Sequence, residues 1–270
     1  MSLDRCFPPL TSAKYKNFNL LYQGSYYKIF KAESNDGKTK CNVRVLDLDS
    51  ETVEKDYNRY ATLFIKEILR FATAHGQLNS IIIEDFELSN NRMAFITTPY
   101  HSLDEEIIQE SAVESLLMDI LSDINFVHEK MKLSELTIST KTIFRLEAHT
   151  TFFLGDWGTG IPEKELKTIS KTELAPNKHT HDGSGVEGFM LGIAGLMAMN
   201  LEIYYIERLL QEEDESSYEF HLEKVLLKLK ESPAKYIFKK ILQKDVRRRC
   251  NVDRLAYLQI PTGKCSNKRI

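Results

Sequence analysis

The sequence has few of the residues that mark disulfide-rich, zinc-binding or collagen-like proteins. Its four cysteines, Cys6, Cys41, Cys250 and Cys265, lie far apart and form no Cys-x-x-Cys pair. We therefore expect free thiols in a reducing compartment and no zinc site. Twelve glycines and seven prolines among 270 residues are too few for a collagen-like chain or a low-complexity linker.

Long apolar runs are also missing. The longest nearly apolar stretch, Gly188 to Met199, is too short to span a bilayer and predicts a buried helix. The first residues, from Met1 to Arg5, lack the basic and apolar segments of a secretory signal. We therefore expect an intracellular protein, cytoplasmic or nuclear, with no membrane span.

An excess of positive charge is absent as well. The net charge of -3 argues against a protein that binds nucleic acid mainly by electrostatics, although it does not exclude a local basic patch. Hydrophobic residues make up 42% of the chain, which excludes wholesale disorder and suffices for one large or two small packed domains.

The first hundred residues predict strands with one helix among them. Asp36-Gly37 separates two strand-like runs, and such a dipeptide predicts a hairpin with a type I′ turn. Apolar residues recur at helical spacing between Glu51 and Ala74. The predicted strands cover residues 18–21, 29–32, 43–48, 80–88 and 93–98.

After Pro99 the pattern becomes helical. An apolar stripe from Leu116 to Val127 predicts one long helix. Short strands are expected at 142–146 and 151–154, and a loop from Gly155 to Gly185. Further helices are expected at 188–199, 201–210, 218–229 and 234–242, with the acidic residues 212–215 in a solvated loop or, alternatively, forming an acidic docking site.

Several short segments resemble motifs of the eukaryotic protein kinases, and they occur in that family's order. Residues 153–158, Phe-Leu-Gly-Asp-Trp-Gly, look like the DFG segment with Trp in place of Phe. Leu174 to Asn177 looks like the APE motif without its Glu, and Glu187 to Gly192 resembles the start of the central helix of the larger lobe. The further matches are Lys66-Glu67-Ile68 with His75, in the αC helix and just after it, and residues 240–249, near the end of the domain.

This resemblance covers nearly the whole chain and implies a fold. We expect an α+β, bilobal protein kinase-like fold that forms one domain over residues 1–270. Residues 1–99 would form a small β-rich N-lobe with one αC helix. Residues 100–270 would form a larger, mainly α-helical C-lobe.

The segment matching the phosphate-covering loop keeps one glycine. Where the family has G-x-G-x-x-G-x-V, this chain retains Gly24, and Tyr22 and Tyr27 replace the outer glycines. Glycines there let the backbone approach phosphate closely. The tyrosines indicate an ordinary hairpin in which they pack or face solvent, and consequently a loop that no longer cradles phosphate.

The strand from Cys41 to Asp47 looks like the one that carries the phosphate-binding lysine, and Arg44 takes that position. The resemblance makes Glu67 its partner on the αC helix. Arg44 keeps the charge, but its planar fork is bulkier than an ammonium group. We expect a partly buried Arg44–Glu67 pair that fills the site without ATP, and Lys28 is a weak substitute for the lysine.

The segment that resembles the catalytic loop lacks the catalytic residues of the family. Anchored on Ile143-Phe144, Glu135 falls at the His of His-Arg-Asp and Thr142 at the Mg²⁺-binding Asn; in a shifted frame Glu135 falls at the catalytic Asp. Both frames stay open, and neither restores the Asp, Lys or Asn. Thr142 is a doubtful metal ligand because a hydroxyl binds a hard cation weakly.

Among the metal-binding positions, Asp156 is intact. It is a Mg²⁺ ligand by resemblance, or alternatively a loop carboxylate that caps backbone amides. Glu187 replaces the Asp of the central helix, and Arg249 matches the late Arg that pairs with the APE Glu. That Glu is Asn177 in this chain. We interpret Glu187 and Arg249 as structural residues.

These losses predict a pseudokinase, an allosteric or scaffolding protein that binds a protein partner, such as an active kinase. Phosphoryl transfer needs clamped phosphates, held Mg²⁺ and an oriented acceptor, and each is impaired here. The alternatives are an atypical Ser/Thr kinase that uses Arg44 or Lys28, Glu135 and Asp156, or an ATP-binding switch. We expect no cofactor, or ATP with Mg²⁺ bound weakly, and no nucleic acid.

Overall fold

The structure, a computed structural model, describes residues 14–24, 26–48, 50–74, 82–89, 92–134, 136, 138–147, 150–155, 161–162, 183–201, 203–211, 214–250 and 252–255. It combines an antiparallel sheet with several helices, so the α+β class is confirmed. The chain forms two compact units. Unit 1 contains the described parts of residues 1–105 and 143–158, and unit 2 contains those of 106–142 and 159–270.

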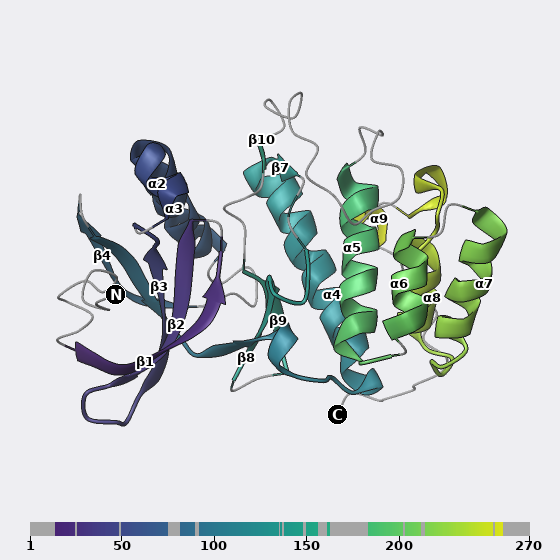
Figure 1. Ribbon diagram of the computed structural model, residues 1–270, viewed down its shortest axis with the longest axis horizontal. Helices are drawn as coiled ribbons and strands as arrows, with labels where there is room; N and C mark the ends of the chain where they lie inside the picture. Colours follow the sequence, from purple (N-terminus) through teal and green to yellow (C-terminus); the bar gives the residue numbers. More distant parts are fainter. Residues whose placement is uncertain are drawn as a thin grey trace, which may run out of the picture. The chain divides into compact units, whose positions relative to one another are not determined.

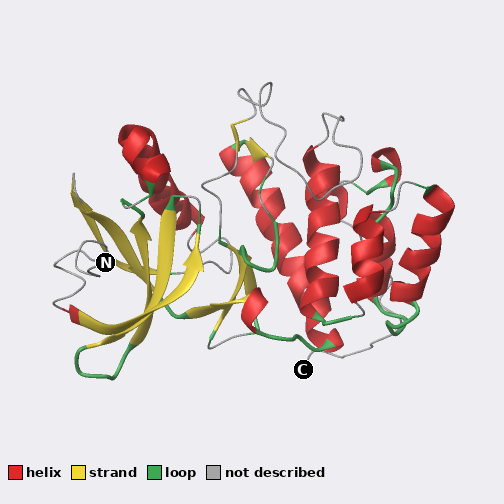
Figure 2. Ribbon diagram, in the orientation of Figure 1, coloured by secondary structure: helices red, strands yellow, loops and turns green. Residues whose placement is uncertain are grey.

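Unit 1 is built on a five-stranded sheet in which all neighbouring strands are antiparallel (Figure 2). The strand order is β1-β2-β3-β5-β4. Each of the five strands overlaps a predicted one. Their bounds are β1 Tyr15–Gln23, β2 Tyr27–Ser34, β3 Lys40–Leu46, β4 Ile83–Ser89 and β5 Arg92–Thr97.

The hairpin between β2 and β3 is confirmed, but the predicted turn type is wrong. Gly37 has a φ of 72° and its N–H donates to the Ser34 carbonyl, whereas Asp36 does not have a positive φ. A type I′ turn needs positive φ at both central residues. The Asp36 carboxylate instead accepts from the Ser34 hydroxyl and the Lys38 N–H, which stabilises a longer loop.

The two faces of this sheet have different partners. On one face Phe30, Val43 and Ile96 belong to an apolar cluster that Tyr15 and Phe18 partly cover. Helix α3 (Tyr57–Ala74) contacts β3, β4 and β5 and lies alongside the sheet in Figure 1. A short helix, α2 (Glu51–Lys55), precedes it. The predicted single helix is therefore divided at Asp56, where φ is -144° and ψ is 57°.

A second, three-stranded sheet completes unit 1. Its order is β6-β8-β9, from β6 (Tyr100–Ser102), β8 (Ile143–Leu146) and β9 (Phe152–Leu154). The last two strands were predicted and β6 was not. A 3₁₀ turn, η2 (Leu103–Glu105), follows β6. The pairing of β8 with β6 and β9 brings Phe144 and Gly155 into the unit that contains Arg44.

Unit 2 is mainly helical (Figure 1). Phe189 on α5 is fully buried, and a Cβ atom at Gly192 would lie 2.6 Å from the Leu242 side chain, so this apolar helix packs closely. It begins five residues before the predicted start. The longer helices are α4 Glu110–Phe126, α5 Gly183–Ala198, α6 Ile203–Gln211, α7 Glu215–Leu226 and α8 Pro233–Ile241.

Shorter elements join these helices. Helix α4 runs into a π-helical turn, η3 (Val127–Met131), which ends at Lys132 with a left-handed φ of 54°. Strand β7 (Leu133–Ser134) pairs with β10 (Ile161–Pro162), and η4 (Val246–Arg248) and α9 (Val252–Leu255) close the described chain.

At the predicted acidic loop, Asp214 caps α7 by accepting from the Ser217 N–H at 2.8 Å, and Glu215 is the first residue of that helix. The other two residues of the acidic run lie outside the described part. Among the residues that the structure places, no helix has the length and apolar character needed to cross a bilayer.

Candidate functional site: a buried arginine in unit 1

Arg44 lies in the middle of β3 with its side chain fully buried. Its Nη1 forms an ion pair with Glu67 of α3, and its Nη2 donates to the Gly155 carbonyl at 2.9 Å. The expected Arg44–Glu67 pair is therefore confirmed. The expectation that it is only partly buried is wrong, because both side chains are 0% exposed.

Aromatic rings enclose the guanidinium group. Its Cζ lies 4.5 Å from the ring centre of Tyr27, and 5.5 Å and 5.4 Å from those of Phe71 and Phe95. Each ring presents a negative π face to the cation. These contacts replace part of the hydration that Arg44 loses on burial.

Glu67 is held from two directions. Arg44 pairs with one carboxylate oxygen, and the Tyr26 hydroxyl donates to the other at 3.3 Å. Burial raises the pKa of Glu67, while the charge of Arg44 acts in the opposite direction. A buried charged pair is costly unless further hydrogen bonds accompany it, and here the Tyr26 hydroxyl and the Gly155 carbonyl supply two.

A second group of rings packs beside Gly155. A Cβ atom at this position would clash with the ring of Phe144, so glycine is required by packing. Phe144 in turn has the rings of Tyr22, Tyr100 and Phe153 at centroid distances of 6.2, 4.9 and 5.7 Å. The segment that bonds Arg44 is thus fixed by an aromatic cluster of unit 1.

Gly24 has a local role of the same kind. Its N–H donates to the Tyr27 carbonyl at 2.8 Å, and a Cβ atom there would lie 2.9 Å from the Tyr27 ring. Tyr27 is fully buried, and its ring centre is 5.7 Å from that of Tyr22. Of the two outcomes left open, packing or exposure to solvent, Tyr27 packs fully, and Tyr22 is half-buried against it. The room that Gly24 leaves is taken by the Tyr27 ring.

Lys28, the other cation proposed for phosphate, is paired within the sheet. Its Nζ lies 2.7 Å from an oxygen of Asp47, and the Gln23 amide donates to the second Asp47 oxygen at 2.9 Å. Lys28, expected only as a weak substitute for the phosphate-binding lysine, therefore has an internal carboxylate partner.

Sequence reasoning missed most of the residues that surround Arg44. It gave no role to Tyr26 or Tyr100 and used Phe144 only to align the catalytic loop. It also did not find that the Asn42 amide donates to the buried Tyr100 carbonyl at 2.9 Å. The available signal was the replacement of two glycines by tyrosines. The direction in which each ring packs depends on strand register, which short motifs do not specify.

In unit 2, Thr142 closes a turn. Its hydroxyl accepts from the Ser139 N–H at 2.9 Å and donates to the Ser139 carbonyl at 3.2 Å. Glu135 and Asp156, the other two residues expected near metal or acceptor, lie outside the described residues. Within the described part, no group of three or more His, Cys, Asp and Glu side chains is placed to hold a metal ion.

Glu187 supports the segment that precedes this turn. It is buried, and one carboxylate oxygen accepts from the Leu136 N–H at 2.7 Å. The other oxygen lies 2.8 Å from Nε2 of His128, a residue of the π-helical turn. The start of α5 is therefore connected to two points of the segment that follows α4, which agrees with a structural role for Glu187.

Arg249 is also buried. Its side chain donates to the carbonyls of Gln243 and Lys244 at 2.6 and 3.0 Å, and its Cζ lies 4.4 Å from the ring centre of Phe189. Burial lowers the pKa of Arg249 to about 10. Its expected partner position, Asn177, lies outside the described residues.

Comparison with known proteins gives no family. No protein-family model matches this chain, and no curated protein matches it either.

Proposed function

We propose that this chain is a pseudokinase, a bilobal kinase-like protein that has lost phosphoryl transfer and acts by binding another protein. The proposal is supported by the motif order in the sequence together with the α+β architecture of a strand-rich unit and a helical unit. The observation that carries it is the closed environment of Arg44.

A phosphate ligand needs a cation that can reach it. The Arg44 guanidinium pairs with Glu67, donates to the Gly155 carbonyl and has no exposed surface. Lys28 pairs with Asp47. Releasing either cation would leave a carboxylate without its partner, and for the fully buried Glu67 this is strongly unfavourable.

The same packing supports a scaffold. Four rings fix the segment around Gly155, and Glu67 attaches α3 to the sheet without any ligand. In an active kinase the corresponding lysine, glutamate and metal must be brought into place for catalysis. Here α3 is held by the protein alone, which suits a surface that a protein partner recognises in one fixed conformation.

A phosphotransfer assay tests the proposal. The full chain is incubated with labelled ATP and either Mg²⁺ or Mn²⁺, alone and with generic protein substrates, beside the Asp156→Ala variant. We expect no autophosphorylation and no transfer above the level of that variant.

Transfer that depends on the metal and disappears in Asp156→Ala would overturn the pseudokinase. It would support the atypical kinase that uses Arg44 or Lys28 for phosphate, Glu135 near the acceptor and Asp156 for metal.

A further inference from the structure

Positive charge is concentrated in residues 224–244, which run from the last turn of α7 to three residues beyond α8 and are flanked by Glu223 and Asp245. This segment contains seven lysines and one carboxylate, Glu231, in a chain of net charge -3. Glu231 lies 2.6 Å from the Nζ of Lys235. The segment therefore keeps a surplus of positive charge, although Glu231 also attracts Lys239 and Asp214 attracts Lys244.

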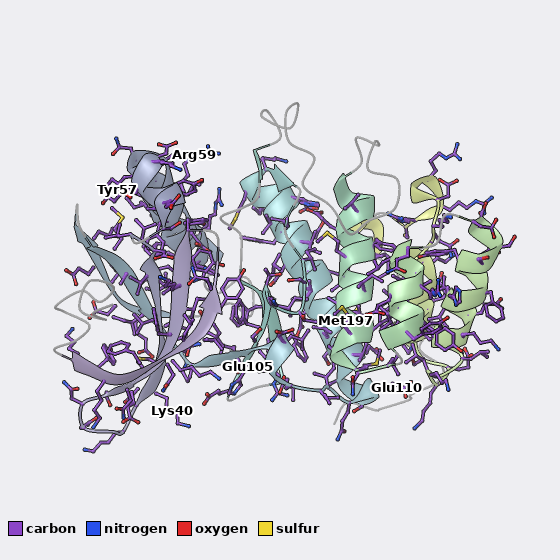
Figure 3. The ribbon with its side chains drawn as sticks, in the orientation of Figure 1. Lys40, Tyr57, Arg59, Glu105, Glu110 and Met197 are labelled. Atoms are coloured by element: carbon purple, nitrogen blue, oxygen red, sulfur yellow. The ribbon has the colours of Figure 1, made fainter. Side chains whose placement is uncertain are left out.

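The turn between α7 and α8 is held firmly. The Lys230 N–H donates to the carboxylate of Glu110, at the start of α4 (Figure 3), at 2.6 Å. The Lys235 Nζ donates to the Leu229 carbonyl, and the Ser232 hydroxyl caps α8. Side chains on this turn and on α8 are thus presented from an ordered backbone.

Three lysines of the turn and α8 are exposed here, and Glu231 acts on one of them, Lys239, through its charge without forming an ion pair. Lys230, Lys239 and Lys240 are exposed, and among the residues that the structure describes none of them forms an ion pair. The Lys240 Nζ lies 5.5 Å from the ring centre of Tyr236.

Exposed apolar side chains occur in the same segment of the chain. Leu227, at the end of α7, is 71% exposed, and Tyr236 on α8 is 39% exposed. A surface of lysines with scattered leucine and tyrosine matches a lipid headgroup region, where the apolar groups enter the interface and the charges remain with the phosphates.

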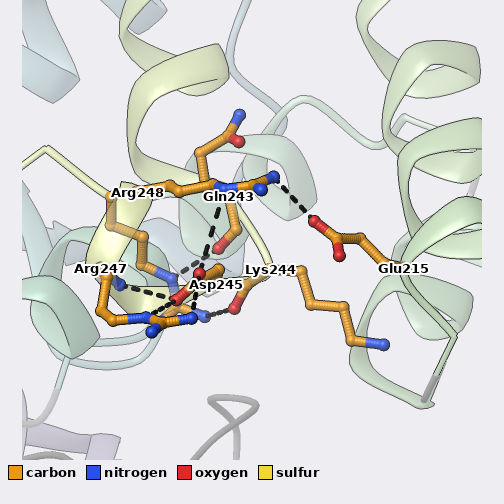
Figure 4. Close-up of polar contacts among 7 residues, drawn as sticks. Glu215, Gln243, Lys244, Asp245, Arg247 and Arg248 are labelled. Atoms are coloured by element: carbon orange, nitrogen blue, oxygen red, sulfur yellow. Dashed lines mark hydrogen bonds and ion pairs between the residues drawn. The ribbon is translucent and has the colours of Figure 1, made fainter.

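The neighbouring arginines are engaged elsewhere (Figure 4). Arg247 binds Asp245 with two nitrogens, Arg248 pairs with Glu215, and Arg249 is buried on backbone carbonyls. The charges left on the surface are therefore those of lysine, which acts as a point charge without the planar fork of arginine. Protein interfaces are depleted in lysine and enriched in arginine, so the composition favours a lipid surface over a protein.

We propose that the lysine surface, defined by Lys230, Lys239 and Lys240 with Leu227 and Tyr236, binds the surface of a membrane that contains anionic phospholipid. The contact is peripheral and reversible. It does not depend on the proposed loss of phosphoryl transfer, because it lies on different residues and requires no nucleotide.

Sedimentation with vesicles tests this proposal. The full chain is mixed with vesicles of phosphatidylcholine alone or of phosphatidylcholine with phosphatidylserine. We expect it to pellet with the phosphatidylserine vesicles only, and to be released as salt is raised. Neutralising each lysine should weaken binding by about fivefold, from about 1 kcal/mol per charge near such a surface. The triple variant Lys230→Gln/Lys239→Gln/Lys240→Gln should therefore lose about a hundredfold.

Two further variants separate this surface from general charge. A matched control, Lys16→Gln/Lys38→Gln/Lys55→Gln, removes three exposed lysines of unit 1 and should bind as the unaltered chain does. Leu227→Gln keeps every charge and should still weaken pelleting. Attraction between charges alone would not be weakened by this change. Equal melting temperatures of all variants show that folding is intact.

Failure to pellet with phosphatidylserine vesicles would overturn the proposal, and so would three other results. These are pelleting that ignores phosphatidylserine, a control triple variant that loses as much as the first, and vesicle binding unaffected by Leu227→Gln. A chain that fails to pellet but binds duplex DNA or an acidic protein through the same three lysines would assign the surface to that other partner.

Discussion

At the scale of single residues, the arginine at position 44 lies where the resemblance to kinases leads us to expect a lysine, and its chemistry has a physical consequence. Arginine has more donors than an ammonium group and a planar fork, so it can bind Glu67 and the Gly155 carbonyl together. Its delocalised charge also stacks against Tyr27. The residue keeps the positive charge that the resemblance requires and commits it to internal partners.

A double-mutant cycle tests this commitment. Glu67→Leu leaves a buried cation without its carboxylate, and Arg44→Met leaves a buried carboxylate, so each should destabilise the fold by about 3–5 kcal/mol. The double variant should cost clearly less than the sum, with a coupling of about 0.5–3 kcal/mol or more. Chemical denaturation measures each free energy of unfolding.

The exposed pair Lys55 and Glu51 on α2 provides the comparison. The same cycle there should give a coupling near zero, since water and salt screen such pairs. Strict additivity at positions 44 and 67 would mean that the two side chains do not interact in solution.

The thiol of Cys41 gives a pH-dependent prediction. Burial raises its pKa to about 12, so the reactive thiolate is almost absent in the folded chain near pH 8. Because the pKa is raised, the thiolate forms only as the pH approaches 12. We expect alkylation at Cys41, located by peptide mass spectrometry, to be slow in the native state and fast in denaturant. Rapid native labelling at Cys41 would contradict its burial.

At the scale of elements, periodic patterns predicted most of the structure. The apolar stripe of α4 and the alternation of the strands are local signals, and the corresponding elements formed as expected. The break at Asp56, the short strand β6 and the π-helical turn were missed, because each depends on packing against distant residues. The prediction of a two-residue type I′ turn was wrong, because the Asp36 carboxylate accepts hydrogen bonds that stabilise a longer loop.

The candidate site was predictable only in part. The resemblance to kinase motifs put Arg44 and Glu67 at positions that pair in that family, and the structure brings them together. The rings of Tyr26, Tyr100 and Phe144 were not predictable, because they meet across three strands and a helix that the sequence does not align.

Helix α5 supplies a prediction at this scale. Phe189 is fully buried and packs under the Arg249 guanidinium. Phe189→Ala should therefore lower the free energy of unfolding by about 3–5 kcal/mol, from lost burial and the cavity left behind. Met197→Ala, on the same helix but 49% exposed, is the control and should cost far less. Equal losses in a denaturant titration would contradict the packing of α5.

At the scale of the whole molecule, the two units differ in their proposed roles. Unit 1 contains a charged centre closed by its own side chains. Unit 2 contains buried polar connections at Glu187 and Arg249 and an exposed lysine surface. Neither feature of unit 2 needs a nucleotide, and a protein that works by binding requires only that these surfaces be presented stably.

Binding of ATP to the full chain tests the central claim most directly. A ligand at a hundred times its dissociation constant stabilises the folded state by about 2.7 kcal/mol, which a thermal-shift measurement detects readily. The melting temperature is followed with rising ATP, with and without Mg²⁺ or Mn²⁺, beside an active protein kinase and the Asp156→Ala variant. We predict no metal-dependent shift for this chain. A saturable, Mg²⁺-dependent rise that Asp156→Ala abolishes would contradict the closed site.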